Sequence, residues 1–278
     1  MAKVISPDGE TTFFEILAGV LQEDTLAPYL FIISLDYAMR LATFNKEELG
    51  FTLKPTRSRR NPAEVITDTD FADDIALLSN TLRQAEELLH RTQDAAKQIG
   101  LHINEKKTEY MTFHIDNPTL QTLDGKNLKY VNDFLYLGSW IGSCEKDVCV
   151  IIGKAWKALQ KMDTIWKSNL SMDLKTIFFK STVESVLLYG SSTWTMTKGL
   201  EKKVNCEYTK MLRVVKGVTW QQHMTNDQLY GSLPKISQVI KESRSKFSGH
   251  CWRSKHEVIS KLLLWEPLHG KRSRGRPA

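Results

Sequence analysis

Residues 64–79 read Glu64-Val65-Ile66-Thr67-Asp68-Thr69-Asp70-Phe71-Ala72-Asp73-Asp74-Ile75-Ala76-Leu77-Leu78-Ser79. The run before the aspartate pair is rich in β-branched residues at roughly alternating positions, and an apolar run resumes directly after the pair. This pattern predicts a β-hairpin whose tip is Phe71-Ala72-Asp73-Asp74. Two adjacent carboxylates therefore lie where the chain reverses direction.

The aspartate pair has more than one interpretation. Adjacent carboxylates repel each other and lose hydration if they are buried, so they need a counter-charge. A divalent cation is the natural one, because hard oxygen ligands hold Mg²⁺ and leave coordination positions for water and phosphate oxygens. A solvated acidic turn is the simpler alternative. A calcium loop does not fit, because counting from Asp68 places Asp73 where an EF-hand requires glycine.

The bulk composition is that of an ordinary globular protein. The chain has 278 residues, 41% of them hydrophobic and 25% charged, which is enough for one large or two medium domains. It has no run of about 18 apolar residues and begins without the layout of a signal peptide. We expect an intracellular protein, cytoplasmic or nuclear, that is not secreted and has no membrane partner. Four widely spaced cysteines favour reduced thiols over a disulfide framework.

Charge is distributed unevenly along the chain. Residues 1–140 hold 14 lysines and arginines against 21 aspartates and glutamates, a net charge of −7, whereas residues 141–278 hold 24 against 11, a net charge of +13. A basic half with interleaved tryptophans suits a polyanion such as nucleic acid, because each phosphate that is neutralised releases counterions. A solvated basic surface is the alternative.

One helix is predicted before the hairpin and one after it. The first covers residues 26–43, and its apolar positions form a wide face, so we expect a core helix that buries Leu26, Leu30, Ile32, Ile33, Tyr37 and Leu41. The second begins at Thr81, which is a suitable N-cap, and runs to Ile99, where Gly100 ends it.

A turn and several short strands follow the second helix. The turn carries Lys106 and Lys107, which we expect to lie close to the acidic tip in a compact sheet. A lysine in that position can stabilise a pyrophosphate leaving group, although a solvated turn explains the same residues. Short strands are predicted at residues 119–123, 128–131 and 134–141, with Asp124-Gly125 as a hairpin turn.

The pattern changes to helices from Cys144 onward. Helical spacing of apolar residues, with lysine-rich polar positions, is present in residues 148–166, 174–188, 200–215 and 235–252. The second part of the chain is therefore predicted to be a helical bundle.

Four segments occur in a familiar order. They are Gly19-Val20-Leu21-Gln22-Glu23-Asp24-Thr25-Leu26-Ala27-Pro28-Tyr29-Leu30-Phe31, Phe71-Ala72-Asp73-Asp74, Gly100-Leu101-His102-Ile103-Asn104-Glu105-Lys106-Lys107-Thr108 and Tyr136-Leu137-Gly138. Because these segments occur in this order, the chain resembles the reverse transcriptase of non-LTR (LINE-type) retrotransposons and is closest to the RTE-like branch. The resemblance extends over essentially its whole length. Each motif alone is weak to moderate, but the four together are a strong signal.

The resemblance implies a fold and a reaction. The fold would be α+β, with a polymerase palm, which is an antiparallel sheet backed by helices, followed by an all-α thumb. Residues 1–143 would form a partial palm, 144–216 the helical thumb, and 217–278 a basic C-terminal helical segment and tail. The implied activity is RNA-directed DNA polymerase. Deoxynucleoside triphosphates would be added to the 3′ end of a DNA primer on an RNA template, with Mg²⁺ (or Mn²⁺) as the cofactor.

The resemblance also implies roles for individual residues. The metal-binding and catalytic residues would be Asp73 and Asp74, with Asp73 the principal ligand. The residues that contact nucleotide or template would be Gly19, Gln22, Phe71, Lys106 and Lys107. The primer grip would be Tyr136, Leu137 and Gly138.

Two departures from the family pattern bear on activity. The family's first metal-binding aspartate lies on a strand upstream of the Gly19 motif, and neither Asp8 nor Asp24 lies in such a context. Glu23 stands where the family typically has glycine, and it adds bulk and negative charge beside an anionic nucleotide. The resemblance therefore predicts a copy that is truncated at the N-terminus and is inactive alone.

An alternative function comes from the basic half. The chain would then be a non-catalytic nucleic-acid-binding protein. Its end, His269-Gly270-Lys271-Arg272-Ser273-Arg274-Gly275-Arg276-Pro277, is similar to the AT-hook, whose arginines enter narrow minor grooves. A zinc site at His250, Cys251 and His256 is disfavoured, because no Cys-x₂-Cys pair accompanies them. Nothing in the sequence predicts the oligomeric state.

Overall fold

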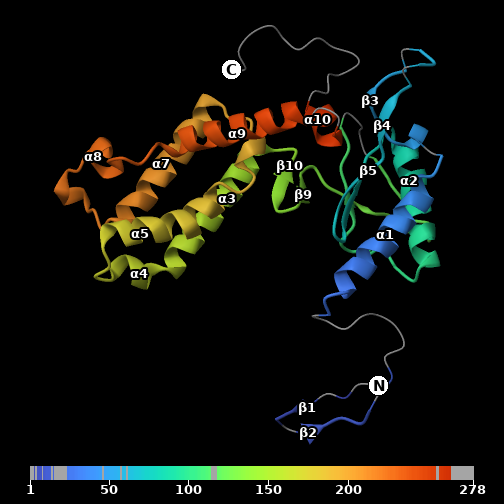
Figure 1. The fold of residues 1–278 in the computed structure, drawn as a ribbon, viewed down its shortest axis with the longest axis horizontal. Helices are drawn as coiled ribbons and strands as arrows, with labels where there is room; N and C mark the ends of the chain where they lie inside the picture. Colours follow the sequence, from blue (N-terminus) through green and yellow to red (C-terminus); the bar gives the residue numbers. More distant parts are fainter. Residues whose placement is uncertain are drawn as a thin grey trace. The chain divides into compact units, whose positions relative to one another are not determined.

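The structure is a computed structural model, and it describes residues 3, 5–7, 9–13, 15, 24–45, 47–56, 58–60, 62–113, 118–254 and 257–263. Its fold is α+β, as the sequence predicts. The chain forms two compact units (Figure 1). Unit 1 comprises Met1–Thr52, Val65–Thr108 and Pro118–Leu128, and unit 2 comprises Leu53–Glu64, Glu109–Asn117 and Lys129–Ala278.

Unit 1 combines two long helices with short strands. Its elements are β1 (Ile5–Ser6), β2 (Gly9–Glu10), α1 (Ala27–Thr43), a 3-10 turn (Glu47–Leu49), β5 (Asp68–Phe71), β6 (Asp74–Leu77) and α2 (Leu82–Gln98). Both β1–β2 and β5–β6 are antiparallel pairs. The strands β3 (Phe51–Lys54) and β4 (Glu64–Ile66) contain the residues at which the chain passes between the units.

Unit 2 is mainly helical. Its strands are β7 (Glu109–Tyr110), β8 (Lys129–Tyr130), β9 (Phe134–Tyr136) and β10 (Ser139–Ile141). Its helices are α3 (Cys144–Lys161), α4 (Asp163–Lys167), α5 (Met172–Phe179), a π-turn (Lys180–Glu184), α6 (Ser185–Leu187), α7 (Lys198–Val215), α8 (Asn226–Tyr230), α9 (Ile236–Arg253) and α10 (Val258–Leu263), with 3-10 turns at Ser191–Thr193 and Trp220–Gln222. The helices predicted after Cys144 are thus present, whereas the division into 1–143, 144–216 and 217–278 stays a prediction.

The helix α2 begins and ends where the sequence predicts. The side chain of Thr81 caps it by accepting a hydrogen bond from the backbone N–H of Gln84 at 3.3 Å. Gly100 follows the helix with a φ of 76°, which favours glycine. The buried side chain of Gln93 fixes the segment beside the helix, because its Oε1 accepts from the backbone N–H of Leu123 at 2.9 Å.

The burial of α1 differs from the prediction. Its buried residues are Ala27, Ala38, Met39 and Ala42. The predicted core face is exposed instead, with Leu26 at 62%, Leu30 at 53%, Ile32 at 52%, Ile33 at 65%, Tyr37 at 57% and Leu41 at 39% exposure. The expectation that these side chains are buried in the core is therefore wrong.

Small side chains explain which side of α1 packs. In the α1–α2 contact Ala38 and Ala42 lie against Ala95, with Ile99 beside them. Alanines let two helix backbones approach closely, so the alanine side of α1 fits α2 and the large side chains remain on the other side.

The core of unit 2 lies between its long helices. Buried side chains from α3, α5, α6, α7 and α9 form one cluster, and its largest fully buried members include Phe179, Leu187, Trp194, Tyr208 and Met211. The buried carboxylate of Asp147 joins the first turn of α3 to this core. It accepts hydrogen bonds from Trp194 Nε1 at 2.7 Å and from the backbone N–H of Trp140 at 2.9 Å, so this buried charge is well partnered.

None of the helices in the described residues is both long and apolar enough to cross a membrane.

Candidate functional site

The β5–β6 hairpin places the aspartate pair at its tip. The strands pair antiparallel, with Phe71 opposite Asp74, so only Ala72 and Asp73 form the turn. Ala72 has a φ of 54°, while Asp73 keeps a negative φ, which is the pattern of a two-residue type II′ turn. A non-glycine residue at positive φ costs of order 1 kcal/mol, and such positions gather at functional sites.

The two faces of this hairpin carry different groups. Residues directly opposite each other on paired strands share a face, and successive residues alternate. The register therefore puts Phe71 and Asp74 on one face, and puts Asp68 and Asp70 together on the other. Asp73, in the turn, belongs to neither strand.

The carboxylates of Asp73 and Asp74 are exposed, and no hydrogen bond or ion pair to either side chain is found in the part of the chain that the structure describes. In the same part, no three His, Cys, Asp or Glu side chains gather as metal ligands. Mg²⁺ is usually held by one or two carboxylates and completes its octahedron with water and substrate phosphates. Two exposed, unpaired carboxylates at a turn fit that mode of binding.

A second acidic group lies behind the tip. Burial, together with the charge of Asp68, a hydrogen bond to Asp68 and the charge of Asp36, raises the pKa of Asp70 to about 6. The hydroxyl of Thr67 donates a hydrogen bond to Asp68. The sequence predicts no functional role for Asp36, Asp68 or Asp70, and Asp68 enters only as the first position of the rejected calcium loop. The Asp68-Thr69-Asp70 spacing, which puts two carboxylates on one strand face, was the available signal.

The lysines predicted to contact nucleotide lie in unit 1. Lys106 and Lys107 belong to a turn in which Asn104 O accepts hydrogen bonds from the backbone N–H groups of Lys107 at 3.0 Å and Thr108 at 2.9 Å. Both lysine side chains are exposed. Among the described residues, no hydrogen bond or ion pair joins them to the hairpin, so their proximity to the acidic tip stays a prediction.

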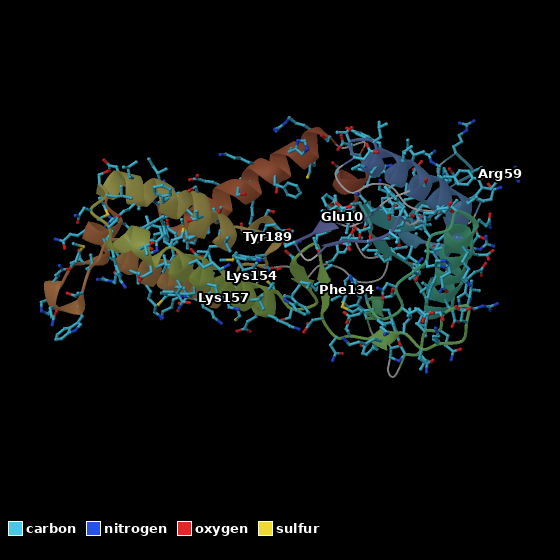
Figure 2. All side chains as sticks on the ribbon, turned by 90° about the horizontal axis from the view of Figure 1, so that it is seen from below. Glu10, Arg59, Phe134, Lys154, Lys157 and Tyr189 are labelled. Carbon is cyan, nitrogen blue, oxygen red and sulfur yellow. The ribbon has the colours of Figure 1, made fainter. Side chains whose placement is uncertain are left out.

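The predicted primer grip is a tight hairpin in unit 2. Tyr136 and Ser139 pair across the turn, and Leu137 and Gly138 both have positive φ, at 48° and 81°, which defines a type I′ turn. Tyr189, labelled in Figure 2, donates a hydrogen bond from Oη to Leu137 O at 2.5 Å. A side chain at position 138 would meet the Tyr189 ring at 3.2 Å, so this turn also needs glycine for space. Tyr189 could not be predicted from the local pattern around the turn, because it lies 52 positions further along the chain.

Other predicted positions fall outside the described residues. These are Gly19 and Gln22, the departure at Glu23, His256 of the disfavoured zinc cluster, and the AT-hook-like residues 269–277.

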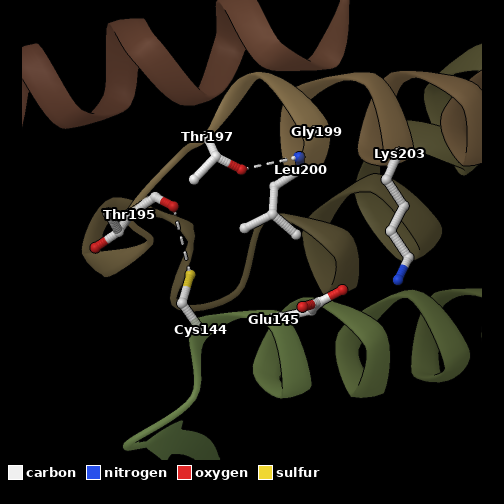
Figure 3. Close-up of a pocket in the computed structure, with 7 residues that line it drawn as sticks. All are labelled: Cys144, Glu145, Thr195, Thr197, Gly199, Leu200 and Lys203. Atoms are coloured by element: carbon white, nitrogen blue, oxygen red, sulfur yellow. Dashed lines mark hydrogen bonds between the residues drawn. The ribbon is translucent and has the colours of Figure 1, made fainter. Parts of the chain in front are cut away.

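Cavities in unit 2 offer further binding surfaces. One of about 500 Å³ lies between the start of α3 and the start of α7 (Figure 3) and is lined by Cys144, Glu145, Thr195, Thr197, Gly199, Leu200 and Lys203. Near it, Lys203 Nζ lies 2.9 Å from the Sγ of Cys149, and this contact raises the pKa of Lys203. A larger groove of about 1040 Å³ follows the outer side of α7. The aspartate pair lines neither of these cavities.

Comparison with known proteins identifies relatives in mobile elements. A transposon-derived protein of Caenorhabditis elegans is 27% identical over 225 residues, 76% of this chain and 81% of the relative. The RNA-directed DNA polymerase from the mobile element jockey of Drosophila funebris is 25% identical over 248 residues, 84% of this chain and 25% of the relative. The Pol polyprotein from the type-1 retrotransposable element R1 of Nasonia vitripennis is 23% identical over 230 residues, 73% of this chain and 66% of the relative.

No solved structure matches the chain. The family described as reverse transcriptase (RNA-dependent DNA polymerase) matches residues 3–141, which is half of the 278 residues and includes the aspartate hairpin. The resemblance found in the motifs is confirmed at this level, and the chain belongs to the reverse transcriptase (RNA-dependent DNA polymerase) family.

Proposed function

We propose that the chain is a reverse transcriptase domain of a non-LTR, RTE-like retrotransposon, built for RNA-directed DNA synthesis. The observation that carries this proposal is the β5–β6 hairpin, which lies within the span that matches the family and exposes Asp73 and Asp74. Among the residues that the structure describes, neither carboxylate has a hydrogen-bond or ion-pair partner. The jockey and R1 relatives support a non-LTR origin. Residues 1–143 would be a partial palm, 144–216 the helical thumb and 217–278 a basic C-terminal helical segment and tail.

The divalent ion in this proposal is Mg²⁺, or Mn²⁺ in its place. When bound, it lowers the pKa of the primer 3′ hydroxyl and neutralises the charge that develops on the triphosphate. Asp73 is the principal ligand, because it lies in the turn itself. Asp74 is the weaker ligand, because its register places it on the face of Phe71.

The other residues position substrates. Phe71 exposes 64% of its surface beside the carboxylates, so its ring is available to a nucleotide. Lys106 and Lys107 supply positive charge for the triphosphate of the incoming deoxynucleotide. Gly19 and Gln22 line the nucleotide and template site, and the turn of Tyr136, Leu137 and Gly138 holds the primer end.

We further propose that the chain alone does not extend a primer. The described residues provide a pair of aspartates at the tip and no third ligand beside them, whereas two-metal catalysis needs carboxylates that hold both ions. Glu23, in place of glycine, adds a negative charge near the nucleotide.

Metal binding at the hairpin tests this proposal apart from activity. Mn²⁺ titrated into the protein and followed by electron paramagnetic resonance should show a site that Asp73→Ala removes. Asp94→Ala, which changes an exposed aspartate on α2, should leave the site unchanged. Equal Mn²⁺ binding by the Asp73→Ala variant would show that the hairpin is not the metal site.

Primer extension tests the second part. With an RNA template, a DNA primer and Mg²⁺ or Mn²⁺, the purified chain should give no product above the Asp73→Ala control. Robust extension that depends on Asp73 would overturn the proposed inactivity and would leave the family function intact.

A further inference from the structure

A basic groove runs along the outer side of α7 in unit 2. Its volume is about 1040 Å³, and it is separate from the smaller cavity of Figure 3. Helix α7 forms one wall, and α8 with the chain that leads into α9 forms the other. The lining residues that matter here are Lys198, Lys202, Asn205, Arg213, Tyr230 and Lys235.

One polar stripe on α7 faces this groove. Lys198, Lys202, Asn205, Thr209 and Arg213 all line it, and they recur every three or four residues, so they lie on one side of the helix. The core-facing residues of α7 lie on a different side and include Val204, Tyr208, Met211 and Val215. At 1.5 Å per residue, the stripe is about 22 Å long. It is therefore a track that can contact several consecutive groups of an extended ligand.

Positive charge predominates in the groove. The basic lining residues are Lys198, Lys202, Lys210, Arg213 and Lys235, whereas the acidic ones are Glu201 and Asp227. Glu201 is already paired with Lys241 at 2.9 Å, and Lys210 is paired with Glu207 at 2.6 Å.

The remaining lysines of the groove are available for a ligand. For Lys198, Lys202 and Lys235, no hydrogen bond or ion pair to the ammonium group occurs within the described ranges. Three cations in one groove repel one another, and a polyanion removes that repulsion while releasing its own counterions.

Hydrogen bonds between the elements that line the groove fix its shape. Thr209 Oγ1 and Tyr230 Oη lie 2.9 Å apart, and Asn205 Nδ2 donates to Ser237 Oγ at 3.0 Å. These bonds tie α7 to α8 and to the first turn of α9. The groove is therefore formed before any ligand arrives, which reduces the ordering that binding requires.

An exposed aromatic side chain follows the C-terminal end of α7 and does not itself line the groove. Trp220 is 79% exposed and lies in the connection between α7 and α8. Arg213 fixes this connection, because its Nη2 donates to Met224 O and to Asn226 Oδ1, each at 3.0 Å. Proteins that bind single-stranded nucleic acid combine a basic groove with exposed aromatic side chains, because the cations bind phosphates and an unpaired base stacks on the ring.

We propose that this groove binds a single strand of nucleic acid, with the phosphodiester backbone along Lys198, Lys202 and Lys235 and a base on Trp220. The proposal rests on the nucleic-acid chemistry of the proposed function and deepens it, because it assigns part of that binding to a surface other than the Asp73-Asp74 hairpin. The contacts are to phosphates and a base face, so RNA and DNA strands share them.

Fluorescence anisotropy with a labelled oligouridine of about 20 nucleotides tests this groove. The experiment uses the full chain in EDTA, so that metal binding at the hairpin plays no part. Lys198→Gln/Lys202→Gln/Lys235→Gln should weaken binding about tenfold or more and lower the slope of log K against log salt by about 2, because each lost phosphate contact contributes about 0.7.

A matched triple variant separates the groove from net charge. Lys154, Lys157 and Lys161 lie exposed on α3 (Figure 2 labels the first two), and changing all three to Gln removes the same charge. This control should change affinity less than about threefold. Equal losses of affinity in the two triple variants would show that binding follows net charge, and would overturn the proposal that the groove is the binding site. No loss of affinity in either variant would overturn it as well.

Separate experiments test the stacking contact at Trp220 and the preference for single strands over duplexes. Trp220→Ala should weaken binding about fivefold or more with an unchanged salt slope, whereas Trp252→Ala, at a tryptophan that is 67% exposed on α9, should not.

A labelled duplex of the same length should bind more weakly, and Trp220→Ala should change its affinity little. A duplex that binds as tightly, with the same sensitivity to Trp220, would overturn the assignment to single strands. All variants should unfold like the parent by circular dichroism.

Discussion

Asp70 sits in an electrostatically costly position behind the aspartate tip. Its pKa is raised to about 6, first by burial and then by Asp68 and Asp36. In the unfolded chain its pKa is near 3.8, so between these values the folded state holds the proton more tightly than the unfolded state does. The free energy of unfolding therefore falls as pH rises from about 4 to about 6, and the full cost remains above that window.

Asp70→Asn removes this cost. Because the side chain is partly exposed and solvent screens it, we expect a gain of only about 1 kcal/mol in unfolding free energy at pH 7, vanishing below about pH 4. Urea unfolding at a series of pH values measures it. Far-UV circular dichroism is the suitable signal, because unit 1 contains none of the seven tryptophans. Asp94→Asn on α2 is the control, and a gain at Asp70 that persists at pH 4 would contradict the electrostatic explanation.

At the residue scale, the sequence predicts features that depend on neighbours in the chain and not those that depend on distant residues. The alternation around Asp73 and Asp74 was sufficient to predict the hairpin and its tip, because strand periodicity is local. The raised pKa of Asp70 was not predicted, since one of its causes, Asp36, lies on helix α1, far from the strand of Asp70 in the sequence. Tyr189, which bonds to the turn at Leu137 from 52 positions away, is equally invisible to a local pattern.

At the scale of elements, α1 is the instructive case. Its apolar positions were correctly predicted to be helical. The side that packs was predicted wrongly, because apolar residues on two sides of a helix indicate no single direction of packing. The contact with α2 is decided by Ala38, Ala42 and Ala95, whose small size matters only when two helix surfaces are compared.

Substitutions on the two sides of α1 should behave differently. Ile33→Lys and Tyr37→Lys change side chains that are 65% and 57% exposed, so each should alter the free energy of unfolding by no more than about 0.5 kcal/mol. Ala38→Glu puts a charge against α2 at a position that is 2% exposed, and should cost about 2 kcal/mol or more. Urea unfolding followed by circular dichroism measures both. A loss at Ile33 as large as that at Ala38 would mean that the outer side of α1 is covered in solution.

At the scale of the whole molecule, charge separates the two halves of the sequence. This asymmetry could be read without a structure, because it depends on composition alone: −7 for residues 1–140 and +13 for residues 141–278. The sequence does not show which basic residues form a binding surface. In the sequence, the stripe from Lys198 to Arg213 has the pattern of an ordinary solvated helix face. In the structure, α8 and the connection that Arg213 fixes form the other side of a groove along it. Lysines on α3 have the same sequence pattern and line neither of the cavities in unit 2.

The asymmetry predicts where the salt dependence of nucleic-acid binding originates. Arg59→Gln/Arg60→Gln removes two exposed charges from the half of the sequence whose net charge is −7. If that half makes no phosphate contacts, the slope of log K against log salt for oligouridine should change by less than about 0.3. Lys198→Gln/Lys202→Gln removes the same charge from the groove and should lower the slope by about 1.4. Anisotropy titrations between low and moderate salt measure both variants. If the arginine pair lowers the slope as much as the lysine pair, the polyanion contacts both halves, and the division of charge along the sequence does not correspond to a division of binding.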